Sequence, residues 1–140
     1  MSPHRLLQIA LVMIGGLCCL LYPLAIVWPS GWAWHAGPPE ASHYFMMIVG
    51  LYVTLGIFLI LAARDPHANC SLIVFTIWSS LVHAAIMTVQ ALGNAMDHGH
   101  LIGDVPALVG AAAILGGLLY ADRDYPAKDA ARASAWAGTI

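Results

Sequence analysis

The chain has 140 residues, of which 61% are hydrophobic and only 9% are charged, and its formal net charge is −2. Soluble globular domains carry roughly 25% charged residues, so this composition excludes that class and indicates one membrane domain. The small negative charge gives no reason to expect a nucleic acid as partner, and we expect membrane lipid instead.

Four apolar stretches divide the chain, at residues 6–28, 39–64, 66–92 and 105–121. A helix needs about 20 residues to cross a hydrocarbon core, and it satisfies its backbone hydrogen bonds internally. We therefore predict an all-α fold. Residues 1–122 should form a four-helix transmembrane bundle in up-down-up-down order, followed by a polar cytoplasmic tail over 123–140.

The basic residues predict the orientation of this bundle. They precede the first stretch, separate the second from the third, and follow the fourth: Arg5, Arg64, Arg123, Lys128 and Arg132. The loops 29–38 and 93–104 contain no Lys or Arg. Because these residues accumulate in cytoplasmic loops, both termini should be cytoplasmic and the other two loops should lie outside.

Proline and aspartate mark the expected helix boundaries. Pro23 removes one backbone hydrogen bond and should kink the first helix near its outer third. Pro39 should lie in the first turn of the second helix, and Pro66 at the first position of the third. Asp65 and Asp104 are expected to cap the third and fourth helices.

Small residues predict close helix contacts on the first and fourth helices, because they let two backbones approach. Self-association through such faces is a further expectation. The first helix carries Gly15, Gly16 and Cys19, and the fourth carries Gly103, Gly110 and Gly117.

The first outer loop is rich in tryptophan. Trp28, Trp32 and Trp34 are expected to form an interfacial belt, since indole rings favour the headgroup level. The alternative is that Trp32 and Trp34 stack on a ligand, together with Tyr44 at the start of the second helix.

The third helix carries a polar stripe. At 100° per residue its members fall within about an 80° arc. His83 lies at membrane depth, so it should face the bundle interior or a water-filled cavity, which makes it a functional hypothesis. The alternative is a neutral His83 that joins two helices by a hydrogen bond. The stripe consists of Thr76, Ser80, His83, Met87, Gln90 and Asn94.

Imidazole and carboxylate groups gather at the outer end. Such groups suit Zn, Cu or Fe, and nearby methionines would favour reduced copper. The alternatives are a capping role for Asp104 and an ordinary interfacial role for His43. The predicted metal ligands are His43, His83, Asp97, His98, His100 and Asp104.

Two short motifs are similar to those of BphX-like proteins, small four-helix membrane proteins of unknown function in bacteria. They are the turn Ala62-Ala63-Arg64-Asp65-Pro66 and the spacing of Trp78 from His83-Ala84. The resemblance implies a bacterial inner membrane, and it carries no catalytic residues.

Three classes of function fit these patterns. The first is a binding protein whose outward-facing cavity holds a small apolar or lipid-like molecule oriented by His83 and Gln90. The second is a metal-dependent membrane enzyme or redox subunit that uses the outer histidines. The third is an accessory subunit of a larger membrane complex. The substitution His83→Leu should abolish ligand binding in the first class and be nearly neutral in the third.

Overall fold

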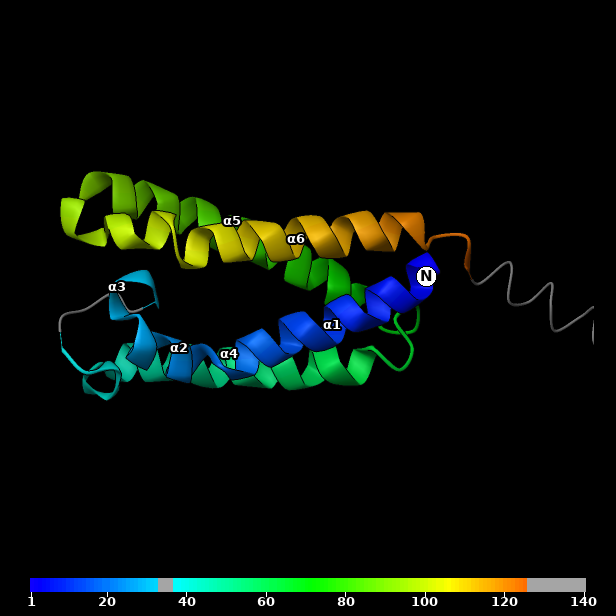
Figure 1. The fold of residues 1–140 in the computed structure, drawn as a ribbon, viewed down its shortest axis with the longest axis horizontal. Coiled ribbons are helices and arrows are strands. Elements are labelled where there is room, and N and C mark those ends of the chain that lie inside the picture. Colours follow the sequence, from blue (N-terminus) through cyan, green and yellow to red (C-terminus); the bar gives the residue numbers. More distant parts are fainter. Residues whose placement is uncertain (33–36, 126–140) are drawn as a thin grey trace, which may run out of the picture.

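The computed structural model describes residues 1–32 and 37–125, and this part of the chain contains helices and turns without any strand (Figure 1). The prediction of an all-α protein is confirmed. The α-helices are α1 (Pro3–Cys19), α2 (Leu21–Val27), α3 (Pro29–Trp32), α4 (His43–Ala62), α5 (Cys70–Gly93) and α6 (Asp104–Ala121). Two 3-10 helices, η1 (Pro39–Ala41) and η2 (Ala95–Leu101), precede α4 and α6.

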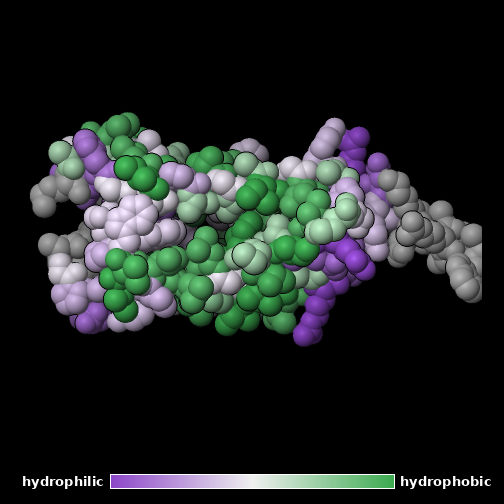
Figure 2. All heavy atoms as spheres, viewed as in Figure 1, coloured by the Kyte–Doolittle hydropathy of each residue, from purple (hydrophilic) through white to green (hydrophobic). Residues whose placement is uncertain are grey.

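Three helical segments are long and apolar enough to cross a membrane, namely α4, α5 and residues 97–121. The pair α1 and α2 meets the same test if it counts as one span, although the two helices are bent by 58°. Figure 2 shows a hydrophobic band across the middle of one face, with hydrophilic residues gathered toward the ends. The chain therefore has the build of an integral membrane protein with three to four spans.

The break between α1 and α2 lies at Leu20, three residues before the predicted kink site at Pro23. Pro23 has no N–H to donate to the carbonyl of Cys19, and its ring crowds that carbonyl. The regular ladder therefore ends one turn earlier. The Leu20 N–H closes it by approaching the carbonyls of Gly16 and Leu17, both at 3.1 Å.

The second predicted helix starts later than Pro39. Residues 39–41 form η1, and Ser42 caps α4, because its Oγ accepts a hydrogen bond from the Phe45 N–H at 3.1 Å. A serine cap satisfies one of the free N–H groups of the first turn, whereas Pro39 offers no side-chain acceptor.

The third helix begins at Cys70, so the prediction that Asp65 caps it and Pro66 opens it is wrong. Asp65 instead accepts the Ala68 N–H at 3.1 Å and closes a separate turn. Asp104 was expected to cap the fourth helix. It is the first residue of α6, and Gly103 occupies the cap position.

The long helices form two pairs, α1 with α4 and α5 with α6, and α1 also contacts α6. By contrast, α4 and α5 have few contacts with each other. The N-terminus, the α4–α5 connection and the end of α6 lie at one end of the molecule, which we call the basic end because it carries Arg5, Arg64 and Arg123 (Figure 1). The opposite end, which holds α3, η1 and η2, is the α3 end.

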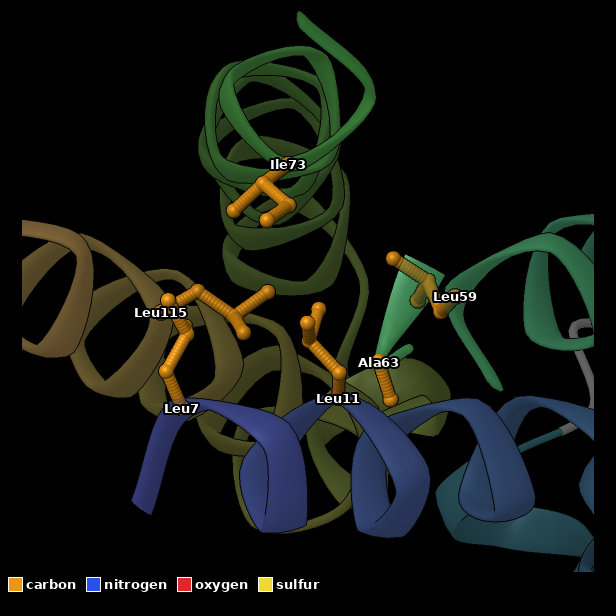
Figure 3. Packing of buried hydrophobic residues seen from close by; sticks show 6 residues of the cluster. All are labelled: Leu7, Leu11, Leu59, Ala63, Ile73 and Leu115. Atoms are coloured by element: carbon orange, nitrogen blue, oxygen red, sulfur yellow. The ribbon is translucent and has the colours of Figure 1, made fainter. Parts of the chain in front are cut away.

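The densest packing lies toward the basic end. A cluster of buried aliphatic side chains from α1, α4, α5 and α6 meets there (Figure 3). Five of its six members have no exposed surface. The cluster joins the two helix pairs and consists of Leu7, Leu11, Leu59, Ala63, Ile73 and Leu115.

The small-residue prediction holds at some of its positions. A Cβ built at Gly15 would lie 2.6 Å from the carbonyl oxygen of Gly56 on α4, and one at Gly56 would lie 2.8 Å from Cys19 Sγ, whereas one at Gly16 would meet nothing within 4 Å. Before and along α6, Gly103 lies against the Gly31 backbone, but a Cβ at Gly110 or Gly117 would meet nothing within 4 Å in the described part of the chain.

Candidate functional site

A cavity of about 680 Å³ separates the two helix pairs in the half of the molecule toward the α3 end. Its walls come from α1, α4, α5 and α6, and most of the side chains that line it are apolar, such as Leu17, Phe45, Ile48 and Leu55. This volume is typical of small-molecule pockets, which are apolar with a few polar groups.

The polar stripe of α5 forms one wall of the cavity. Thr76, Ser80 and Met87 are buried there, His83 is half-buried, and Gln90 is exposed at the rim. The remaining member of the predicted stripe, Asn94, follows the end of α5 and is not part of the lining. Its amide donates to Asp97 Oδ2 at 2.8 Å.

His83 bonds across the cavity to Tyr52 of α4, with 2.6 Å between Nδ1 and the phenol oxygen. The two rings are tilted by 46°, with their centroids 5.9 Å apart. This bond connects two helices that have few other contacts, so the predicted interhelical hydrogen bond of His83 exists and also lies in the wall of a cavity.

Tyr52 was missed by the sequence reasoning. Its helix is apolar on nearly every side, so the hydrophobic pattern does not mark the inward face. A usable signal was the spacing of Tyr44, Ile48 and Tyr52, since residues four apart share a helix face and all three line the cavity.

At the α3 end, backbone contacts join the two helix pairs. Gly31 is buried, and a Cβ at Gly103 would collide with its carbonyl oxygen; Gly99 meets the Ser30 backbone in the same way. Glycine at these positions lets α3 lie directly on η2 and the start of α6.

Two of the three aromatic residues predicted for ligand binding line the cavity, and the third is not described by the structure. Trp32 is half-buried and lines the cavity, while Tyr44 is exposed at its rim. Trp34 lies outside the described residues, as does the part of the predicted tail beyond Tyr125.

The predicted outer metal ligands are only partly brought together. His100 Nδ1 and Asp104 Oδ2 form a buried pair 2.8 Å apart. Both Asp97 and Asp104 line the cavity, whereas His43 and His98 are exposed. A metal site at this end stays a prediction.

A different group has the spacing of metal ligands. His4, His67 and Asp122 lie at the basic end, and one ligand atom from each lies within 4.8 Å of the others. Within residues 1–32 and 37–125, it is the one group of three His, Cys, Asp or Glu side chains whose ligand atoms lie this close together. No sequence motif marked it, since its members are 63 and 55 positions apart in the chain.

Comparison with known proteins places the chain in a family without assigning an activity. A search of curated proteins and a search of solved structures give no match. The BphX-like resemblance therefore stays a prediction. A family model described as a family of unknown function, DUF6632, matches residues 1–134. The chain belongs to this family.

Proposed function

We propose that the protein binds a small amphipathic molecule, such as a single-chain lipid, in the cavity between its two helix pairs. The observation that carries this proposal is the Tyr52–His83 hydrogen bond in the wall of a mostly apolar cavity. A ligand with an apolar body and one polar group matches that wall.

The chemistry of the lining supports an orientation for the ligand. Its polar group lies against His83, Tyr52 and Gln90, while its apolar part contacts Ile48, Leu55 and their neighbours. The Thr76 hydroxyl is less available, because its Oγ1 donates to the Leu72 carbonyl at 2.9 Å. The ligand's main hydrogen bonds in this proposal are to the His83–Tyr52 pair.

The proposal includes four membrane crossings with both termini in the cytoplasm of a bacterial cell. Its support is the position of Arg5, Arg64 and Arg123 at one end of the molecule, since cytoplasmic segments hold the excess of basic residues. The cavity then lies in the outer half of the bilayer.

Entry from the lipid phase fits this placement. At the α3 end the glycine contacts hold α3 on η2, whereas α4 and α5 have few contacts with each other, and Tyr44, Ile86 and Gln90 of the cavity lining are exposed. A molecule dissolved in the bilayer reaches the cavity between α4 and α5 without crossing water.

A photoreactive fatty acid with a diazirine on its chain tests the proposal. The full chain in lipid nanodiscs is labelled by light, and cross-linked residues are mapped by mass spectrometry. We expect labels on Ile48 and Leu55, removed by an excess of unlabelled fatty acid. His83→Leu should weaken this competition roughly tenfold, the factor that one hydrogen bond of about 1.4 kcal/mol provides.

The matched control is His43→Leu, which makes the same change at an exposed histidine outside the cavity. It should leave the competition unchanged. Labels spread over the lipid-facing side chains Phe75 and Val89, with no difference between His83→Leu and the parent, would contradict the proposal and favour an accessory subunit.

A further inference from the structure

The basic end holds a cluster of metal-ligating side chains that the cavity does not use. His4 comes from the first turn of α1, His67 from the turn after α4, and Asp122 from the residue that ends α6. Three segments far apart in the sequence therefore direct their functional groups to one point.

Both imidazoles lie within hydrogen-bond distance of the same carboxylate oxygen of Asp122. His4 Nδ1 lies 2.8 Å from Asp122 Oδ2, and His67 Nε2 lies 2.9 Å from that oxygen. With zinc bonds of 2.0–2.2 Å, neighbouring ligand atoms are about 3.3 Å apart in a tetrahedral site and about 3 Å apart in an octahedral one. Both nitrogen–oxygen distances are within a few tenths of an ångström of this spacing, and all three ligand atoms lie within 4.8 Å of one another.

The surroundings hold these ligands in place. The Asp122 side chain is 3% exposed, while His4 and His67 are 15% and 22% exposed. The Tyr125 ring stacks on His4, with centroids 3.7 Å apart and planes 6° from parallel. The carboxylate is shielded from water, yet the imidazole edges leave a route by which an ion could enter.

We propose that His4, His67 and Asp122 bind a divalent first-row transition metal of the zinc class. Two neutral imidazoles and a carboxylate are a ligand set that zinc takes in proteins, with water in the remaining position. The ion takes the place of the hydrogen bonds between the two imidazoles and the carboxylate, with each neutral imidazole carrying its proton on its other ring nitrogen, and it ties the first helix, the α4–α5 turn and the last helix together. This site is separate from the cavity and does not rest on its proposed ligand.

The test uses the full chain purified in detergent with a tag that contains no histidine. The protein is stripped with EDTA, dialysed, and titrated with Co²⁺ alone, whose visible spectrum reports coordination. We expect one equivalent to bind with a spectrum that Zn²⁺ abolishes by displacement. Metal should also raise the Tm of the stripped protein, because it binds the folded state.

His67→Gln and Asp122→Asn should each weaken Co²⁺ binding by more than about tenfold, since even the loss of a residue that merely orients a ligand costs about that much. Asp124→Asn is the matched control for Asp122→Asn, at a carboxylate that is 68% exposed two residues further along the chain, and it should bind as the parent does. If Asp122→Asn does not fold, His4→Gln still tests the site, because His4 lies in the first turn of α1. The proposal is overturned if the parent gives no cobalt spectrum, or if His4→Gln and His67→Gln both bind Co²⁺ as tightly as the parent does.

Discussion

The two halves of the molecule use the same four long helices in opposite ways. Toward the basic end, Leu7, Leu59, Ile73 and Leu115 fill the space between the helix pairs completely. Toward the α3 end the pairs diverge around a cavity of about 680 Å³, where a hydrogen bond between Tyr52 and His83 links α4 to α5 and α3 lies on η2. We call the tightly packed half the closed half. It joins the two helix pairs, and the cavity in the other half provides the space that the proposed ligand occupies.

The largest expected effect comes from the boundary between the halves. Gly56→Ala would place a Cβ 2.5 Å from the Gly15 carbonyl oxygen, a backbone atom that cannot rotate away. We expect a loss of about 3 kcal/mol in unfolding free energy, the upper part of the usual range for overpacking. Reversible unfolding in mixed micelles with SDS measures it.

The control for this variant is Gly50→Ala on the same helix, where a Cβ would meet nothing within 4 Å. It should be neutral or slightly stabilising, because alanine is the better helix former. Equal effects of the two substitutions would mean that α1 and α4 do not cross at Gly15 and Gly56.

A second pair of variants compares the halves directly. Leu59 is fully buried in the closed half, and Leu55, one turn earlier on α4, lines the cavity. Leu59→Ala should cost about 2 kcal/mol, the low end for buried leucine, because lipid already solvates apolar groups in the unfolded state. Leu55→Ala should cost less, since one side of that residue has no packing partner to lose. The same unfolding measurement decides, and a larger effect at Leu55 would contradict the division into halves.

The smallest expected effect is that of Tyr52→Phe. It removes the hydroxyl that reaches His83 and should lower the unfolding free energy by about 0.6 kcal/mol, an ordinary value for interhelical hydrogen bonds in membranes. Tyr44→Phe, at an exposed tyrosine on the rim, should have no effect on stability. Unfolding curves of the two variants and the parent measure both effects. If Tyr44→Phe lowers the unfolding free energy as much as Tyr52→Phe does, the Tyr52–His83 hydrogen bond has no special role in stability.

The sequence predicted the features that depend on composition and helix periodicity. Apolar length alone predicts membrane-spanning helices, and the 3.6-residue period placed Thr76, Ser80, His83 and Met87 on one face, where the structure has them lining the cavity. Helix ends were less predictable, because local rules compete. Asp104 was expected to cap α6, but its side chain pairs with His100, four residues earlier, and Gly103 takes the cap position.

Contacts between residues that are far apart in the sequence could not be predicted from the sequence alone. His4 and His67 stand alone in their segments, and no spacing rule connects them to Asp122. Their meeting requires α1 to pack between α4 and α6, an arrangement set by Gly15, Gly56 and the leucines of the closed half.

The contact between His4 and Asp122 also has a consequence for biosynthesis. Domains assemble as the chain emerges from the ribosome, and Asp122 emerges more than a hundred residues after His4. This contact therefore cannot form until all the helices between the two residues have been synthesised. A chain that stops before the end of α6 lacks the Asp122 side of the junction at the basic end, even though α1, α4 and α5 are all present.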